Sequence, residues 1–117
     1  MRITAFCLLF IMKYKINKFL TIEEKAKLDG KASGWIIYRK PYTIIQVKRN
    51  LPDKEKALVI IHELTHYIQY KMDDNNTQRV REKIAKRMEE WFRSILDKYP
   101  PFLMGVLDLI EKKENNG

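Results

Sequence analysis

The sequence predicts a small α+β domain in which a short antiparallel sheet, or a single hairpin, packs on a pair of neighbouring helices. Two β-branched runs are separated by a charged break that contains a proline, and two long segments with helical apolar spacing follow them. A cluster of turn-forming residues joins the two helical segments. With 117 residues, the chain has room for one modest core and not for two, so residues 1–117 are expected to form one domain.

The predicted strands lie in the N-terminal half. Residues 35–38 and 42–47 are rich in β-branched and aromatic side chains, and the break at residues 39–41 predicts an antiparallel hairpin. Residues 21–28 begin with a threonine that is followed closely by acidic residues. Because threonine caps helices and acids favour helix N-termini, this segment is predicted to be a short helix that ends at residues 29–30.

A long helix is predicted to start at Pro52 and Asp53, which suit a first helical turn, and to end at residues 73–76. Apolar residues recur along it at helical spacing and give it a core face: Ala57, Ile61, Leu64, Ile68 and Met72. The link to the next helix is short, so the two helices are expected to lie antiparallel beside each other.

The second long helix has Thr77 as its expected N-cap. Its apolar stripe comprises Val80, Ile84, Met88, Trp91, Phe92, Ile95, Leu96 and Tyr99. Prolines at residues 100–101 stop this helix, and a last apolar helix is predicted over residues 102–110. Four large side chains are expected in the core rather than in a binding site: Trp91, Phe92, Phe102 and Leu103.

The two ends of the chain need separate interpretations. Residues 3–12 are apolar except for one threonine, yet a membrane span needs about 20 residues, and no small-residue cleavage site follows them. Either this segment is a buried strand, or translation begins at Met12 and residues 1–11 are an artefact, which is the interpretation we favour. The polar residues 111–117 are expected to fray.

Composition favours a soluble cytoplasmic protein. Hydrophobic residues make up 45% of the chain and charged residues 32%, which is typical of a soluble globular domain. The single cysteine, Cys7, cannot form an internal disulfide, and this favours a reducing compartment. Cys7 is expected to fill the core rather than to act as a nucleophile, because no histidine or acid is near it in the sequence.

The net charge of +8 comes from the N-terminal half. Residues 1–50 contain eleven lysines and arginines against three acids, whereas residues 51–117 contain twelve of each. A basic face could attract an acidic substrate or nucleic acid, but no basic run with interleaved aromatic residues appears, so solubility is the preferred explanation. We expect a monomer without a membrane partner, and nucleic acid stays open as a partner.

The residues His62-Glu63-Leu64-Thr65-His66 form a complete H-E-x-x-H motif and include both histidines of the chain. Residues four apart lie on one face of a helix, so both imidazoles can bind one zinc ion. Glu63 then lies beside the open coordination position, where its carboxylate can take a proton from a zinc-bound water. The alternative is a buried helix with two hydrogen-bonded histidines, which the uncharged flanks and the complete motif disfavour.

A catalytic zinc site normally has three protein ligands. The chain has no third histidine, and Cys7 is far from the motif in sequence, so a downstream carboxylate is expected. Reflecting the midpoint of the two histidines through the linker leads to residue 85 on the antiparallel helix. Glu82 and Glu89 both lie within about one turn of that residue, so this geometry does not decide which of them is the third ligand.

Two further segments carry a family resemblance: Leu51-Pro52-Asp53 before the motif and Val80-Arg81-Glu82-Lys83-Ile84-Ala85 after it. With the motif between them, residues 51–92 resemble the short single-domain H-E-x-x-H metallopeptidases of phage and archaeal type, related to the ImmA/IrrE-like gluzincins. The resemblance implies a zincin-like minimal domain whose second helix supplies a glutamate from an E-x-x-A-like context. Glu82 is then the third zinc ligand beside His62 and His66.

The motif and the resemblance together predict a zinc-dependent metallopeptidase with Glu63 as general base. The oxyanion of the tetrahedral intermediate needs a further donor, for which the sequence offers Tyr67, Arg81 and Tyr42 without choosing among them. The resemblance also implies that an edge strand before the motif helix lines the cleft. That strand would be residues 42–47, which could hold a substrate backbone by strand addition.

The alternative belongs to another functional class. In it, the chain is a zinc-binding regulatory protein of the same fold that cleaves peptides slowly or not at all. Relatives of this type are often coupled to transcription regulators, so the expected partners are a protein or peptide substrate and, as one candidate, a transcription regulator. A purely structural zinc is disfavoured, because structural sites normally have four protein ligands.

Overall fold

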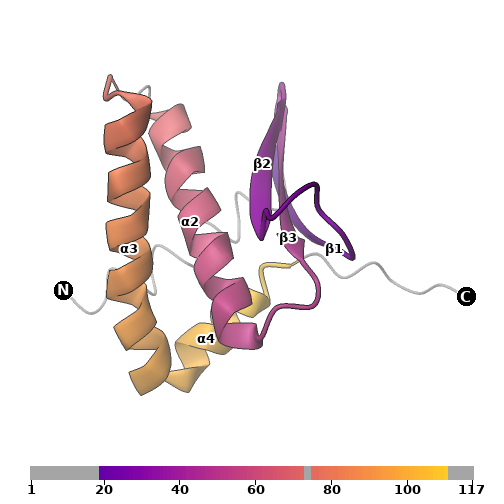
Figure 1. Ribbon diagram of the computed structural model, residues 1–117, viewed down its shortest axis with the longest axis vertical. Coiled ribbons are helices and arrows are strands. Elements are labelled where there is room, and N and C mark those ends of the chain that lie inside the picture. Colours follow the sequence, from indigo (N-terminus) through magenta and orange to yellow (C-terminus); the bar gives the residue numbers. More distant parts are fainter. Residues whose placement is uncertain (1–18, 73–74, 111–117) are drawn as a thin grey trace, which may run out of the picture.

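Among the described elements the strands come first and the helices follow (Figure 1). The computed structural model describes residues 19–72 and 75–110. Within these residues the elements are β1 (Leu20–Lys25), β2 (Gly34–Arg39), β3 (Tyr42–Lys48), α2 (Asp53–Lys71), α3 (Gln78–Lys98) and α4 (Pro100–Leu107). α2 lies between α3 and the sheet, as Figure 1 shows. The predicted α+β class, with a small sheet on a helical hairpin, is confirmed.

The sheet has the strand order β1-β3-β2, which makes β3 its central strand. β2 and β3 pair in antiparallel fashion, from Gly34 opposite Val47 to Arg39 opposite Tyr42, so the predicted hairpin is confirmed. β1 pairs with β3 in the parallel direction, and the sheet is therefore mixed rather than antiparallel throughout. β2 is left as the edge strand on the side away from β1.

The predicted short helix over residues 21–28 is wrong, because residues 21–25 belong to strand β1 and residues 26–28 are not helical. Leu20 and Ile22 are almost fully buried, and their alternation with more exposed residues is the spacing of a strand. Glu23, an acid that suggested a helix start, instead accepts a hydrogen bond of 2.7 Å from the buried Gln46 side chain of β3. Pairing with a distant strand overrides the local helix signals.

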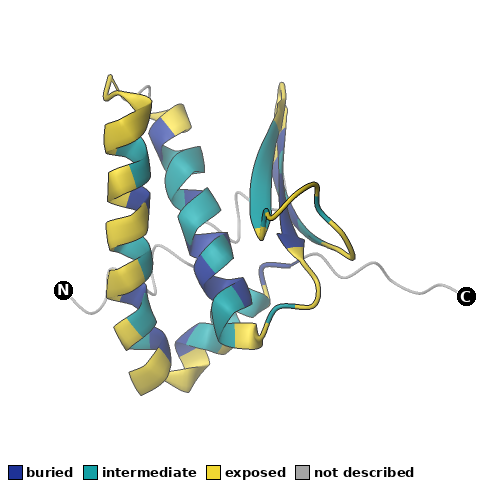
Figure 2. Ribbon diagram, viewed as in Figure 1, coloured by how far each residue is buried: buried dark blue, intermediate teal, exposed yellow. Residues whose placement is uncertain are grey.

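The hydrophobic core lies between the sheet and α2 and continues to α4, as the dark blue segments of Figure 2 show. Its largest fully buried side chains are Ile22, Ile45, Val47, Leu58, Ile60 and Val106. Burying an aliphatic side chain of this size stabilises the fold by about 1.5–3 kcal/mol. The rings of Phe92 and Phe102 stack 5.3 Å apart and join α3 to α4. Packing in this core therefore fixes the position of α2 against the sheet.

α3 packs on α2 through a narrower stripe than its sequence predicts. Thr77 caps the helix as expected, since its hydroxyl accepts a hydrogen bond from the Val80 N–H. The buried residues of α3 are Ala85, Phe92 and Leu96. Exposed residues of the predicted apolar faces are Val80, Ile84, Trp91 and Tyr99, together with Met72 after α2. The prediction that Trp91 lies in the core is wrong, because its side chain is 56% exposed. It lies on α3, which is separated from the sheet by α2 (Figure 1).

α4 begins at Pro100, two residues before the predicted start, and ends at Leu107 rather than at residue 110. Proline suits the first turn of a helix, where the backbone N–H has no partner within the helix. Phe102 is buried and Leu103 is partly buried, as predicted.

Among the described residues, no helix combines the length and the apolar character needed to cross a membrane. The predictions for residues 3–12, for Cys7 and for residues 111–117 concern parts of the chain outside the described residues.

Gly34, at the start of β2, lies against α2 with no room for a side chain. A Cβ atom there would lie 2.3 Å from Val59 Cγ1 and 3.1 Å from the Gln46 carbonyl oxygen. We expect Gly34→Ala to lower the free energy of unfolding by about 1–3 kcal/mol in urea denaturation, because strand and helix must move apart. Gly105→Ala is the control: a Cβ there meets nothing within 4 Å, so stability should change by less than about 1 kcal/mol. Equal unfolding midpoints for wild type and Gly34→Ala would contradict the close packing of β2 on α2.

Candidate metal and catalytic site

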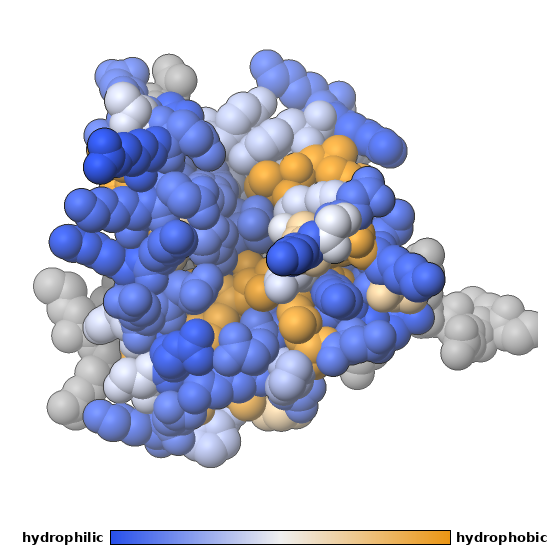
Figure 3. Space-filling model, in the orientation of Figure 1, coloured by the Kyte–Doolittle hydropathy of each residue, from blue (hydrophilic) through white to orange (hydrophobic). Residues whose placement is uncertain are grey.

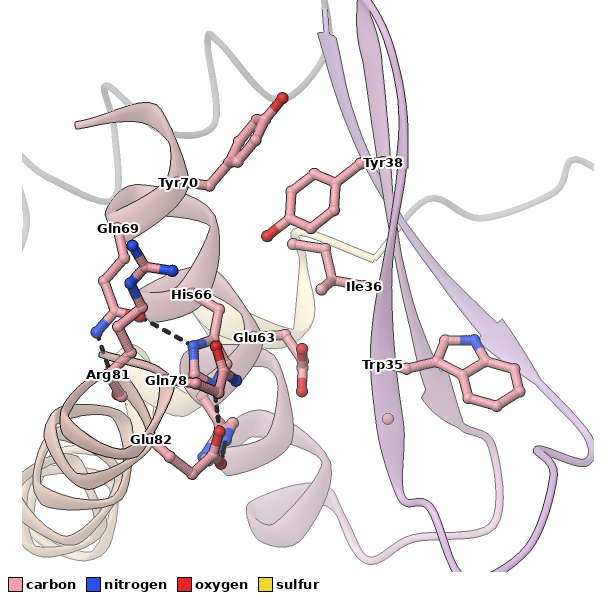
Figure 4. A pocket seen from close by; sticks show the side chains of 12 residues that line it. Trp35, Ile36, Tyr38, Glu63, His66, Gln69, Tyr70, Gln78, Arg81 and Glu82 are labelled. Atoms are coloured by element: carbon pink, nitrogen blue, oxygen red, sulfur yellow. Dashed lines mark hydrogen bonds and ion pairs between the residues drawn. The ribbon is translucent and has the colours of Figure 1, made fainter. Parts of the chain in front are cut away.

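The H-E-x-x-H motif lies in the middle of α2, on the side that faces α3 and an open cleft (Figure 4). Ile61 and Leu64 point into the core from the opposite side of the helix and are buried. His62 and His66 are one turn apart, and their rings lie edge to face with centroids 4.9 Å apart. Core packing on one side of α2 therefore orients both imidazoles on the other.

Glu82, near the start of α3, reaches both histidines of α2. Its Oε1 lies 2.8 Å from His62 Nε2, and its Oε2 lies 3.0 Å from His66 Nε2. The candidate ligand atoms of the three residues all lie within 4.8 Å of one another. Two imidazole nitrogens and one carboxylate oxygen are a donor set typical of catalytic zinc, which keeps a further position open. The three residues therefore fit a zinc ion.

The second nitrogen of each imidazole has a partner of its own. His62 Nδ1 lies 3.0 Å from Glu89 Oε1, and His66 Nδ1 lies 2.9 Å from Gln69 Oε1. Both partners present acceptor oxygens, so these two contacts are satisfied by the tautomer in which Nδ1 carries the proton and donates it. The Gln69 amide in turn donates to the Arg81 carbonyl oxygen at 3.1 Å. Hydrogen bonds of this kind fix the tautomer and the ring orientation of histidines that bind metals.

This tautomer favours a bound cation between the helices. A neutral imidazole that donates from Nδ1 directs the lone pair of Nε2 at the Glu82 carboxylate. Lone pairs and a carboxylate repel one another at such distances unless the imidazoles are protonated or a cation lies between them. A divalent cation removes the repulsion for both histidines together.

Glu63 points away from α3, into the space between α2 and β2 (Figure 4). Burial raises the pKa of its carboxyl group above the ordinary value, His62 and His66 oppose this rise, and Glu82 adds to it. The carboxyl group lies on the same cleft as the two imidazoles but takes no part in the contacts of Glu82. It is thus placed to exchange a proton with a molecule in the cleft.

The cleft has a volume of about 460 Å³ and lies between α2, the start of α3 and the edge strand β2. Its lining residues are Gly34, Trp35, Ile36, Tyr38, His62, Glu63, His66, Gln69, Tyr70, Gln78, Arg81 and Glu82. In Figure 3 the α3 side of this face is hydrophilic, and hydrophobic side chains are visible between the helices and the strands. The cleft is open to solvent, so an extended chain could enter it.

Of the three expected oxyanion donors, only Arg81 lines the cleft. Tyr67 packs against the core, and Tyr42 lies on β3 beside a neighbouring hollow. Tyr38 of β2 was not among the expected donors, yet it lines the cleft and its hydroxyl points into it (Figure 4). Burial raises the pKa of this hydroxyl, the nearby Glu63 carboxylate raises it further, and Arg81 opposes the rise.

The predicted edge strand over residues 42–47 is also corrected. Those residues form β3, which pairs with β1 on one side and with β2 on the other, so it has no free edge for a substrate strand. The edge strand that lines the cleft is β2. Side chains alternate between the two faces of a strand, so Gly34, Ile36 and Tyr38 lie on one face of β2. This alternation is visible in the sequence, but only the strand order shows that β2 is the strand beside the cleft.

No protein-family model matches this chain, and no curated protein and no solved structure is significantly similar to it. The functional interpretation therefore depends on the residues of the site and on their geometry.

Proposed function

We propose that this chain is a zinc-dependent metallopeptidase, of the ImmA/IrrE-like gluzincin kind that its motif resembles. The observation that carries the proposal is the convergence of His62, His66 and Glu82 from two helices, with Glu63 beside them on an open cleft. A structural metal site would be closed by a fourth protein ligand, and among the described residues only these three are grouped in this way.

The residues of the site have distinct roles in this proposal. His62, His66 and Glu82 hold the zinc ion, which when bound would supply a Lewis acid for a water molecule and for the scissile carbonyl. Glu63 takes a proton from the attacking water and delivers it to the leaving amine. Burial raises the pKa of the Glu63 carboxyl group and so favours its protonated form. This suits the step in which Glu63 delivers the proton to the leaving amine.

The proposed substrate is a protein or peptide in extended conformation. β2 lines the cleft and is the edge strand of the sheet, so its backbone can pair with a substrate strand while side chains on one face contact the substrate. A cytoplasmic location belongs to the same proposal, and a transcription regulator is one candidate substrate or partner.

Metal analysis and cleavage together test the proposal. Purified protein is expected to contain close to equimolar zinc and to generate new N-termini in a whole-cell extract, as detected by mass spectrometry. A chelator should abolish the cleavage, and added zinc should restore it. Cleavage that continues after complete removal of the metal would refute a zinc peptidase.

Tyr38 is the proposed donor to the oxyanion, because its hydroxyl points into the cleft from the strand opposite Glu63 (Figure 4). We expect Tyr38→Phe to lower kcat by about 10²-fold with little change in KM, since the donor acts on charge that develops only in the transition state. Tyr99→Phe is the matched control, because Tyr99 is an exposed tyrosine at the end of α3 that lines neither the cleft nor the neighbouring hollow, and it should retain wild-type kcat. A normal kcat for Tyr38→Phe would leave Arg81 as the donor.

A further inference from the structure

A second hollow of about 510 Å³ adjoins the catalytic cleft beyond the end of β2. Its lining includes four aromatic residues and two lysines: Phe19, Tyr38, Tyr42, Tyr70, Lys40 and Lys71. Tyr38 and Tyr70 line the cleft as well, and their ring centroids are 4.3 Å apart. A ligand that passes this pair of rings therefore moves from the cleft into the hollow.

Exposed aromatic rings gather at this hollow. Phe19, Tyr38, Tyr42 and Tyr70 are each between 41% and 56% exposed, and all four line it. Large apolar and aromatic side chains grouped on a surface mark binding sites more often than scattered ones do. Tyrosine in particular offers a wide ring and a hydroxyl donor, which suits it to peptide recognition.

The charged side chains that the described residues contribute to the hollow are both lysines. Lys40 and Lys71 line it, and no acidic residue among the described part of the chain does so. The Lys71 ammonium lies 5.6 Å from the ring centroid of Tyr67 and 6.0 Å from that of Tyr70, within reach of cation–π attraction. These rings hold one cation beside the hollow, where it can meet an anionic group of a ligand.

The position of the hollow also fits a peptide bound along β2. Gly34 and Ile36 line only the cleft, Tyr38 lines both spaces, and Lys40 follows it at the hollow. A strand advances by about 3.3 Å per residue, so a substrate paired with β2 reaches the hollow a few residues from the catalytic group. Side chains on that part of the substrate meet the rings and the two lysines.

We propose that this hollow is a substrate subsite that binds an acidic side chain of the peptide, aspartate or glutamate, at a fixed distance from the cleaved bond. The proposal rests on the proposed peptidase function, because it identifies the class of peptide that the same cleft receives. The lysines supply the charge, and the tyrosine rings contact the aliphatic part of the acidic residue and its neighbours.

A charge-reversal pair tests the preference in cleavage. Among peptides cut in a cell extract, wild type is expected to enrich acidic residues at one position relative to the cleaved bond. The double variant Lys40→Glu, Lys71→Glu should lower the cleavage of such peptides about fivefold or more relative to neutral ones, given what exposed ion pairs contribute. The control, Lys31→Glu, Lys48→Glu, has the same net charge and alters exposed lysines outside the hollow, so it should keep the wild-type preference.

A binding experiment separates this proposal from the peptidase function. Calorimetry with the Glu63→Gln protein compares two capped decapeptides that differ only in a pair of glutamates against a pair of glutamines. We expect the acidic peptide to bind about fivefold more tightly, and the difference to vanish or invert when Lys40→Glu and Lys71→Glu are added.

The possible results decide between the two proposals. An acidic preference in binding without any cleavage by wild type would retain the subsite and reject the peptidase. Cleavage without an acidic preference, or the same preference in both double variants, would reject the subsite and retain the peptidase. Tighter binding of an oligothymidylate than of the acidic peptide, lost in the Lys40→Glu, Lys71→Glu protein, would identify a nucleic-acid site and also overturn the proposal.

Discussion

Glu63→Gln is expected to lower peptide hydrolysis by about 10²–10⁴-fold while the protein keeps its zinc. Glutamine has the shape of glutamate but cannot take a proton from water at neutral pH. Glu63 does not belong to the group of residues that could hold the metal, so its replacement should leave metal content unchanged. The measurement combines kcat on a cleaved peptide with zinc content of the same preparation.

Glu90→Gln provides the control for this prediction. Glu90 is exposed on α3 and does not line the cleft, so the variant should hydrolyse peptides at the wild-type rate. Wild-type turnover by Glu63→Gln would be incompatible with a general base at this position. If Glu63→Gln retains a biological activity that His62→Ala loses, the chain is instead a zinc-binding regulatory protein without proteolytic turnover.

The motif could be found in the sequence because its geometry is local. His62 and His66 are one helical turn apart, so any helix through these residues places both imidazoles on one face. The helix itself is predicted by apolar spacing and by flanking turn residues, and its observed bounds of Asp53–Lys71 agree with this pattern. No information about distant parts of the chain is needed at this stage.

The choice between Glu82 and Glu89 is different, because it depends on distances across two helices. The two residues are seven positions apart, close to two helical turns, so both lie on the same face of α3. The structure brings both to His62, with Glu82 at Nε2 and Glu89 at Nδ1. Helical spacing cannot separate two residues that approach opposite edges of one ring, and the family resemblance was needed to favour Glu82.

Strand β1 and the identity of the edge strand could not be predicted, because both follow from pairing between distant residues. Leu20 pairs with Thr43, 23 positions later, and this pairing places β3 at the centre of the sheet. The cleft is therefore lined by Tyr38 of β2 rather than by Tyr42 of β3. The exposure of Trp91 has a similar origin, since apolar spacing identifies a stripe but not whether a neighbour covers it.

Zinc affinity of two glutamine variants should separate a metal ligand from a residue that orients one. Glu82→Gln is expected to lose most of its zinc on dialysis, because Glu82 supplies the carboxylate that both Nε2 atoms share. Glu89→Gln should weaken zinc binding by about 10–100-fold, the range observed when a hydrogen-bond partner of a histidine ligand is removed. Competition with a chelator of known affinity measures both effects.

The order of the zinc affinities of the variants distinguishes a direct ligand from a residue that acts through a ligand. Wild type and Glu90→Gln should bind zinc equally, Glu89→Gln more weakly, and Glu82→Gln the most weakly, because the contact of Glu89 reaches the metal only through the His62 ring. Circular dichroism of each metal-free variant checks that the fold is retained. Full zinc retention in Glu82→Gln with loss in Glu89→Gln would exchange the two roles: Glu89 would be the ligand, and His62 would bind through Nδ1 rather than Nε2.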